Sequence, residues 1–378
     1  MNLRPSGYEP DELPDCSTPR RRSLVYHAAQ VPPYVERLPK IHLHCHLEGT
    51  MRATTFLDLT DRYGLGLRYL PGSGSEVPEP SRDIEHAFAF ADFREFLLLF
   101  AAVSRSLATP DDYARLAAEF VQDAKAQHVL YGEMFVSPSV WSFFHPKLDV
   151  IACFEAIHAE FAREPSMEFR MIVDLTRNFG AAGALETAEL AAGLTRYGVI
   201  GVGLGGDEAR FPAELFADAF AFARSEGLHT VAHAGEADGA ESVRSAIEAL
   251  GAERIGHGVR ALEHPEVAEL LRSREIVCEV CPTSNYRTGV VGPDEAHPLG
   301  AMLEAELPLI IDADDPTLFG TSISQEYALV AKAFGPQVLT ACIDRAISAS
   351  FADSASKQRL RIALHEAIAA TNPESEAL

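Results

Sequence analysis

The chain has 378 residues, of which 47% are hydrophobic and 23% are charged, so it can bury a large core and is too apolar for wholesale disorder. Its formal net charge is −23, from 32 basic and 55 acidic residues. Nucleic acids and membrane surfaces are anionic and would repel such a chain, which argues against both as partners. A small substrate with little charge is expected instead, and the sequence leaves the oligomeric state open.

The cysteines indicate a reducing compartment. They are sparse for a chain of this length, and most lie inside apolar runs, unlike the cysteines of a disulfide framework. No secretory signal is visible, and no apolar run reaches the roughly 18 residues that a membrane span needs. We therefore expect a cytoplasmic protein. The six cysteines are Cys16, Cys45, Cys153, Cys278, Cys281 and Cys342.

The two ends of the chain differ in composition from the part between them. Residues 1–33 are rich in Pro, Arg, Asp and Ser and show little periodicity, which predicts an extended or partly disordered arm. Residues 372–378 resemble a short tail of the same kind. The intervening residues 34–371 alternate regularly between strand-like and helix-like runs, and we expect one domain there.

Eight short runs rich in β-branched residues alternate with longer amphipathic runs, for example 212–227 and 263–274. Strands that alternate with helices predict parallel pairing through right-handed crossovers. Eight such units favour an α/β fold of the (β/α)₈ TIM-barrel type over an open sheet. The predicted strands lie within residues 39–49, 130–136, 168–177, 199–208, 229–236, 253–258, 275–282 and 307–316.

Residues 64–128 separate the first two predicted strands by far more than one crossover helix. This insertion contains the loop-like stretch YLPGSGSEVPEPS and the helical stretch AFADFREFLLLFAAVSRSL. Loops that follow barrel strands lie over the active-site face, so the position of the insertion favours a lid over plain packing on the barrel rim.

Polar side chains gather at the ends of the predicted strands. His44 and His46 lie two residues apart on the first strand, so both point to one face and could reach the same metal ion. Such a pair is a weak signal alone. Barrel enzymes keep their sites at the carboxyl ends of several strands, and three other strands end in comparable residues. These residues are His233, His257, Asp314 and Asp315.

The residue types suit hydrolytic zinc chemistry. Three histidines and a carboxylate could hold zinc together with a water molecule, whose pKa would fall to about 7. Glu236 lies three residues after His233 and is free to act as a general acid. His257 could either orient the water or deprotonate it.

Other readings of these residues are less favoured. His46, Glu48 and the pair Cys278 and Cys281 mimic the motifs of small zinc nucleobase deaminases, but more than 200 residues intervene and the proline before the first cysteine is missing. We expect the two cysteines in the core. Hydrolysis of esters or phosphotriesters commonly uses two metals bridged by a modified lysine or a glutamate, and no predicted strand offers an obvious lysine for that bridge. A catalytically silent barrel would require a broken site.

Six motifs in fixed order give the chain a recognisable pattern: PKIHLHCHLEGTMR, GLGGDE, HAGE, RIGHG, EVCPTSN and DADDP, which span residues 39–316. In this pattern the chain resembles the adenosine deaminase family of the amidohydrolase superfamily. The resemblance implies one zinc ion per subunit, held by His44, His46, His233 and Asp314.

The resemblance also implies roles for the residues around the substrate. Glu236 would protonate the purine N1 while activated water attacks C6, and His257 would orient that water and assist proton transfer. Asp315 would hydrogen-bond to N7 and the backbone amide of Gly206 to N3, while His46 would also border the substrate. The products are a 6-oxopurine and ammonia.

The residues on the sugar side of the substrate combine two patterns of the family. Glu48 stands where nucleoside deaminases of the family usually carry an aspartate that contacts the sugar, and many adenine deaminases have glutamate there. GGDE and RIGHG stand as in the nucleoside enzymes. The prediction is deamination of adenosine and 2′-deoxyadenosine, with adenine or a modified adenosine such as 6-aminodeoxyfutalosine as the alternative. His42 replaces a frequent glutamate, and we expect it in the barrel interior, with a supporting role beside the ligands open.

Overall fold

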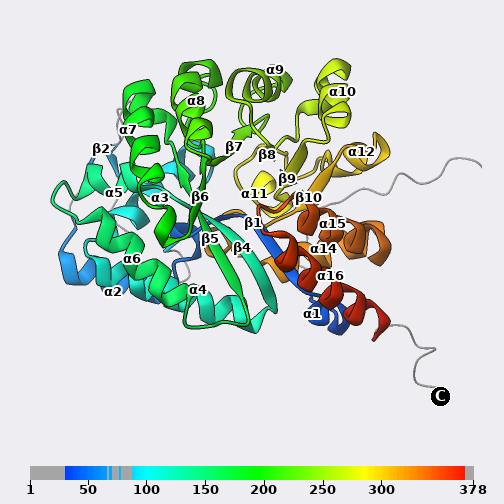
Figure 1. Cartoon of the computed structure of the whole chain (residues 1–378), viewed down its shortest axis with the longest axis horizontal. Helices are drawn as coiled ribbons and strands as arrows, with labels where there is room; N and C mark the ends of the chain where they lie inside the picture. The colour runs from blue at the N-terminus through cyan, green and yellow to red at the C-terminus, as the bar shows by residue number, and fades with distance from the viewer. Residues whose placement is uncertain (1–29, 66–67, 70–75, 78–86, 371–378) are drawn as a thin grey trace, which may run out of the picture.

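The computed structural model describes residues 30–65, 68–69, 76–77 and 87–370. Most of the predicted arm and the predicted tail at 372–378 lie outside these residues. The described chain forms one eight-stranded parallel sheet, in the order β1-β4-β5-β6-β7-β8-β9-β10, and a two-stranded hairpin. Helices surround the eight strands, as Figure 1 shows.

Each predicted strand run coincides with one strand of the large sheet. Parallel strands covered on both faces are built from nearly continuous apolar runs, and the side chains of these strands are almost all buried. The strands are β1 Lys40–His46, β4 Val129–Val136, β5 Glu168–Asp174, β6 Val199–Gly203, β7 His229–Ala234, β8 Arg254–His257, β9 Val277–Val280 and β10 Leu309–Ile311.

The sheet closes between its first and last strands. A single parallel bridge joins Cys45 on β1 to Asp314, just beyond β10. In this bridge the Asp314 amide donates to the His44 carbonyl and the His46 amide donates to the Asp314 carbonyl, both at 3.0 Å. Closure of eight parallel strands with connecting helices confirms the predicted (β/α)₈ barrel.

The helices follow the strands in chain order. Those between β1 and β6 are α2 Ala53–Tyr63, α3 Phe93–Ser106, α4 Pro110–Ala126, α5 Pro138–Phe144, α6 Val150–Phe161 and α7 Gly180–Ala192. Those between β6 and β10 are α8 Ala217–Ser225, α9 Ala240–Ser245, α10 Pro265–Ser273, α11 Pro282–Arg287 and α12 Leu299–Glu304. The chain begins with α1 Pro33–Arg37 and ends with α13 Pro316–Phe319, α14 Ile323–Phe334, α15 Pro336–Ala349 and α16 Ser354–Ala369.

Side chains on β1 alternate between the helical layer and the barrel interior. Leu43 and Cys45 belong to the large apolar cluster, whereas His42 and His44 face charged residues of other strands. A smaller cluster of Phe135, Ile172 and Val231 forms a separate apolar layer. The barrel thus has an apolar outer layer and an interior that mixes apolar and charged groups.

The predicted insertion at 64–128 divides into parts with different surroundings. The hairpin pairs β2 Arg68–Tyr69 with β3 Glu76–Val77 in antiparallel fashion. Helix α3 packs against α2 and α5, whereas α4 packs along α6 and β4 as a helix of the barrel's outer layer. Lid closure by this region stays a prediction.

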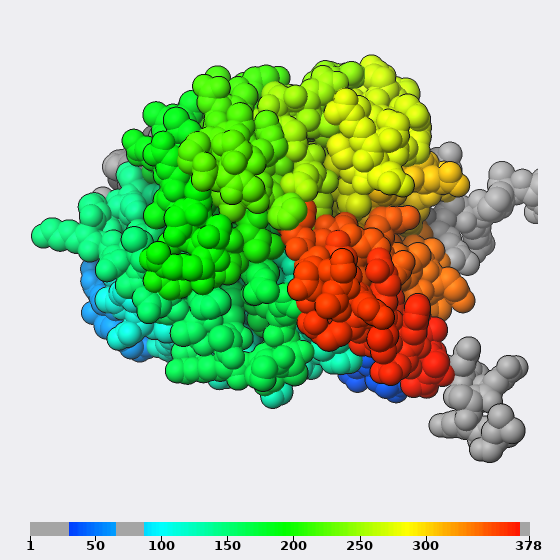
Figure 2. Space-filling model, in the orientation of Figure 1, coloured from blue at the N-terminus to red at the C-terminus, as the bar shows by residue number. Residues whose placement is uncertain are grey.

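The outside of the barrel is closely packed. In the space-filling view of Figure 2, the orange and red C-terminal helices lie directly against the green and yellow segments. None of the helices within the described residues combines the length and apolar character needed to cross a bilayer.

Candidate active site

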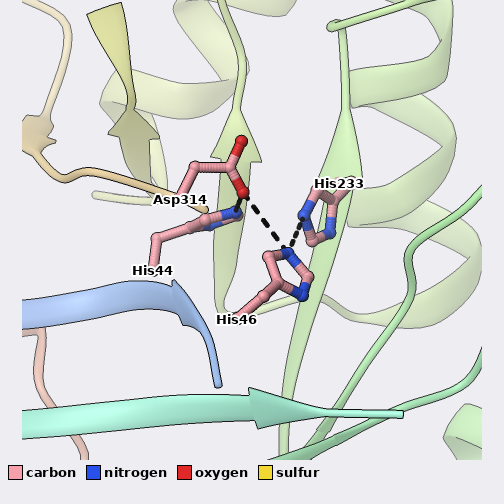
Figure 3. A group of neighbouring side chains, drawn as sticks. All are labelled: His44, His46, His233 and Asp314. Carbon is pink, nitrogen blue, oxygen red and sulfur yellow. Dashed lines mark hydrogen bonds and ion pairs between the residues drawn. The ribbon is translucent and has the colours of Figure 1, made fainter. Parts of the chain in front are cut away.

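The four predicted metal ligands come together at the carboxyl end of the barrel. The candidate ligand atoms of His44, His46, His233 and Asp314 all lie within 4.8 Å of one another, and all four residues are buried. Figure 3 shows the side chains converging from β1, β7 and the segment after β10. The Nε2 atoms of His46 and His233 are 3.2 Å apart. Two unprotonated nitrogens at this distance would repel each other unless a proton or a metal ion lay between them.

Backbone geometry fixes these ligands. His44 and His46 point to one face because strand side chains alternate. Asp314 has a φ of 61°, a left-handed conformation that is uncommon for residues other than glycine. The bridge that closes the barrel holds Asp314 there, and its Oδ1 lies 3.4 Å from His46 Nε2 and 3.5 Å from His44 Nε2.

In two of the histidines, His44 and His233, one ring nitrogen is hydrogen-bonded to another residue and the other is left for a metal. His44 Nδ1 donates to Glu279 Oε2 at 2.6 Å, and His233 Nδ1 donates to the Leu204 carbonyl at 3.1 Å. Their Nε2 atoms are therefore the unprotonated ones when the rings are neutral. Among the described residues, buried His44 Nε2 has no hydrogen-bond partner, as expected of a ligand nitrogen before metal binding.

The pKa shifts within the group of four predicted ligands bear on cation binding. Desolvation lowers the pKa of His46 to about 4 and also lowers the pKa of His233, so both rings are neutral near pH 7. Desolvation acts to raise the pKa of Asp314, but its hydrogen bond with His44 and the neighbouring imidazoles outweigh burial and lower it. Desolvation acts to lower the pKa of His44, but its hydrogen bonds with Asp314 and Glu279 outweigh burial and raise it, so a metal would have to displace a proton from this ring. Unprotonated imidazole nitrogens and a carboxylate are donors that zinc prefers.

His44 is supported by a row of buried charged side chains, Glu279, Arg254 and Glu133, which we call the charge chain. Glu279 accepts from His44 through one oxygen and from Arg254 Nε through the other, each at 2.6 Å. Arg254 Nη2 lies 2.6 Å from Glu133 Oε2 on the opposite side. All four side chains are fully buried. Sequence reasoning missed Glu133, Arg254 and Glu279, because their partners are distant in the chain.

The loop after β7 positions Glu236. The carboxylate of Glu208, from the GGDE motif, accepts hydrogen bonds from four successive loop amides, the shortest being Gly235 N at 2.6 Å. Glu236 lines the pocket, and its Oε2 lies 3.5 Å from His257 Nε2. Desolvation and the nearby Asp314 charge raise the pKa of Glu236 well above its usual range.

His257 ends β8 with a φ of 62° and is fully buried. Its Nδ1 lies 3.2 Å from Asn285 Nδ2, and its Nε2 points toward Glu236 and, at 3.8 Å, toward Asp314 Oδ2. Burial lowers the pKa of His257 to about 3. A neutral ring in this position can donate or accept one hydrogen bond at Nε2, depending on its tautomer.

The two residues predicted to hold the purine edge also line the pocket. Gly206 has a φ of 99°, and a Cβ there would lie 2.6 Å from Asn178 Oδ1, so both conformation and space require glycine. Asp315 is buried, and its Oδ1 has no hydrogen-bond partner among the described residues. Desolvation and Asp314 raise its pKa well above the usual range.

Glu48 lies behind the pocket wall. Its Oε1 accepts from Trp141 Nε1 at 2.6 Å and from Ser137 N at 3.0 Å, and the residue is 1% exposed. Ser137 lines the pocket, and Glu48 does not belong to the described lining. The predicted contact of Glu48 with substrate stays a prediction.

The remaining pocket wall combines polar groups of β5 and β6 with an aromatic surface. Asp174 ends β5, and its Oδ1 has no hydrogen-bond partner among the described residues. Desolvation and Glu48 raise the pKa of Asp174 to about 7. The described lining contains no Lys or Arg. Sequence analysis did not single out the lining residues Asp174, Thr176, Asn178, Phe93, Phe96, Phe100, Phe143 and Phe179.

Residues that the sequence did not predict to take part in the reaction lie as follows. His42 is buried and pairs with Asp312 in the barrel interior. Cys278 and Cys281 are buried free thiols. Lys40, a lysine on β1, uses its ammonium group on the carbonyls of Val35, Glu36 and Leu38 around α1.

Comparison with known proteins agrees with this geometry. A model of the adenosine deaminase family matches residues 39–367. The chain belongs to the adenosine deaminase family. It therefore belongs to the hydrolases that act on the amidine C–N bond of purines, within the amidohydrolase superfamily.

Relatives within the adenosine deaminase family differ in their substrates. The chain is 35% identical over 344 residues to the adenine deaminase of Rhodospirillum rubrum, covering 90% of this chain and 99% of that one. It is 33% identical to the aminodeoxyfutalosine deaminase of Streptomyces coelicolor, covering 86% and 84%. An amidohydrolase from Burkholderia ambifaria with bound zinc has a TM-score of 0.79 and 27% identity, covering 93% and 97%.

Proposed function

We propose that this protein catalyses the zinc-dependent hydrolytic deamination of adenine to hypoxanthine and ammonia. This substrate replaces adenosine, the sequence prediction, because similar proteins are named for adenine alone or for aminodeoxyfutalosine, whereas two putative ones are named for adenosine and adenine jointly. The alternative reading from the sequence is therefore the better supported one.

A metal would be held by His44, His46, His233 and Asp314, whose buried donor atoms converge and include an unpartnered imidazole nitrogen. Zinc in this position would supply a Lewis acid that acidifies water. The chain's own residues would supply the rest. A carboxyl with a raised pKa, such as Glu236, keeps its proton near neutral pH and can donate it to N1 as water adds to C6.

The order of polar groups around the barrel matches the order of nitrogens around a purine. Glu236 follows β7, Gly206 follows β6, Asp174 ends β5 and Asp315 follows β10. With N1 at Glu236 and N7 at Asp315, N3 falls to Gly206 and N9 to Asp174. This register places each ring nitrogen against one group of suitable polarity, since a protonated Asp315 can donate to N7.

The unpartnered Oδ1 of Asp174 is the observation that carries the choice of adenine. Free adenine has an N–H at the imidazole edge that a nucleoside lacks, because N9 then carries the sugar. A buried acceptor gains from that donor and loses when an analogue lacks it. Glu48, the expected sugar contact, uses its Oε1 on Trp141 and Ser137 and does not belong to the described pocket lining.

A modified adenosine is the second candidate, and the aromatic wall favours it. Phe93, Phe96 and Phe100 from α3, with Phe143 and Phe179, give the pocket an apolar surface suited to a ring-bearing substituent. The absence of Lys and Arg from the described lining disfavours a phosphate-bearing substrate. 6-Aminodeoxyfutalosine represents this candidate.

Ammonia release from zinc-loaded protein tests the assignment. The panel is adenine, adenosine, 2′-deoxyadenosine and 6-aminodeoxyfutalosine. We expect the highest kcat/KM for adenine, and we expect Asp174→Ala to lower kcat/KM for adenine by about 10- to 100-fold while changing that for nucleosides little. A preference for adenosine that Asp174→Ala leaves unchanged would contradict the proposal.

A further inference from the structure

A chain of hydrogen bonds runs from the start of α12 to the active-site histidine. Leu299 N donates to His297 Nδ1 at 3.0 Å, His297 Nε2 lies 3.1 Å from Asn285 Oδ1, and Asn285 Nδ2 lies 3.2 Å from His257 Nδ1. Asn285 and His257 are fully buried, and His297 is 3% exposed. None of these bonds involves a predicted metal ligand.

The direction of the chain is fixed at its outer end. A backbone amide can only donate, so His297 Nδ1 must be an acceptor. Burial lowers the pKa of His297 to about 3, so the ring is neutral and carries its single proton on Nε2. That proton is donated to Asn285 Oδ1, which turns the amide nitrogen of Asn285 toward His257.

The same reasoning fixes the inner end. The amide nitrogen of Asn285 can only donate, so His257 Nδ1 accepts. The proton of the neutral His257 ring is then on Nε2, which has no hydrogen-bond partner among the described residues and faces Glu236 and Asp314. The reverse arrangement would leave a lone pair in the pocket instead.

We propose that Asn285 and His297 are positioning residues that hold His257 as its Nε2–H tautomer, so that His257 donates a hydrogen bond into the pocket. This inference rests on the proposed function for its catalytic consequence. His257 then orients the attacking water and can donate to the oxygen that develops at C6. The sequence left open whether His257 orients the water or deprotonates it. Because a ring protonated at Nε2 cannot accept a proton there, the hydrogen-bond chain favours the orienting role.

Nitrogen NMR of the zinc-loaded protein with ring-¹⁵N histidine measures the tautomer directly. Two-bond proton correlations distinguish Nδ1–H from Nε2–H rings, and His257→Gln identifies the resonances of residue 257. We expect Nε2–H for His257 and for His297. An Nδ1–H ring at residue 257 would overturn the proposal whether or not any purine is turned over. A protein that turns over no purine but shows Nε2–H would count against the proposed function alone.

Variants that change the hydrogen-bonding groups of Asn285 and His297 give the kinetic test. Asn285→Asp places an acceptor at His257 Nδ1 and should convert the ring to Nδ1–H, lowering kcat by about 10²- to 10⁴-fold with KM changed little, as for other misplaced histidine tautomers. Zinc content should stay the same. His297→Gln retains a donor toward Asn285 and should keep kcat within about threefold of wild type, whereas His297→Leu removes that donor and should lower it. Unchanged kcat in Asn285→Asp would refute the proposal.

Discussion

Burial gives two neighbouring carboxyl groups opposite protonation states. Around Asp314 the imidazoles outweigh desolvation and the pKa falls, whereas around Glu236 desolvation and the Asp314 charge act together and the pKa rises. Environments that push two carboxyl pKa values apart separate a group that carries charge from a group that carries a proton. We infer that Asp314 serves as a ligand and Glu236 as the acid.

Glu236→Gln tests the proton-carrying role. The amide keeps the size of the side chain but has no acidic proton for N1, so kcat should fall by about 10²- to 10⁴-fold. Zinc content and the affinity for hypoxanthine, measured by calorimetry, should change little. Wild-type turnover in this variant would show that another group protonates the ring.

Glu279→Gln tests the support of His44. The substitution removes the carboxylate that orients His44 and pairs with Arg254, so zinc affinity should fall by about 10- to 100-fold. Competition with a chromogenic chelator measures the affinity. Glu269→Gln, on the exposed face of α10, is the matched control and should leave affinity unchanged. Equal affinities in the two variants would contradict this role.

The predicted metal ligands could be named from the sequence, but the residues that hold them in place could not. HxH spacing on one strand and polar residues after strands are local patterns, so His44, His46 and Asp314 could be found without a structure. Glu279 and Asn285 act through partners on other strands, and a sequence pattern carries no information about such contacts. The family motifs contained both residues without assigning them a role.

At the scale of elements, the insertion before β4 shows that the apolar periodicity of a helix does not reveal what the helix packs against. Both α3 and α4 are amphipathic, and both lie in the predicted insertion 64–128. Only α3 supplies pocket residues, whereas α4 packs along α6. An apolar helix face looks the same in sequence whether it covers a barrel or a pocket, so the division required the structure.

The first turn of α14 contains a buried carboxyl that should make stability depend on pH. Glu326 accepts from Thr283 N at 3.1 Å and from Thr321 Oγ1 at 2.5 Å, yet desolvation raises its pKa to about 7. A raised folded-state pKa gives stability that is complete below the usual pKa of 4.5 and is lost as pH rises toward 7.

Glu326→Gln should remove that loss. Between pH 4.5 and pH 7 the wild type should lose up to about 3 kcal/mol that the variant keeps, because Gln stays neutral and can still bond to both partners. Urea unfolding at pH 5 and pH 7.5 measures the difference between the two proteins. A difference that does not grow with pH would show that Glu326 is ionised without cost.

At the scale of the whole molecule, the metal site joins distant parts of the chain. Its four predicted ligands come from β1, β7 and the segment after β10, where the barrel also closes through a single bridge. Metal binding to the folded state alone stabilises that state by mass action. The sequence predicted the barrel from its eight alternating units, but the closure at Asp314 is visible only in the structure.

Metal removal should therefore lower the melting temperature. Free zinc at 1,000 times its dissociation constant adds about 4 kcal/mol to the folded state. A chelator should remove that contribution and lower Tm by several degrees in differential scanning fluorimetry, and added zinc should restore it. His46→Asn, which lacks a ligand, should respond less to the chelator. An equal response in both proteins would place the stabilising metal elsewhere.

Phe351 contacts the charged residues that connect the opposite end of the barrel to the predicted metal site. The ring lies over the Arg254 guanidinium at 3.9 Å, and its amide donates to Glu133 Oε1 at 2.6 Å, so the residue touches the charge chain that ends at His44. Phe351 lies in the short connection between α15 and α16, the red helix of Figure 1. Anyone who shortens this protein for crystallisation or fuses a reporter to it should leave the α15–α16 connection intact, since loss of Phe351 would remove a contact to the charged residues that support His44.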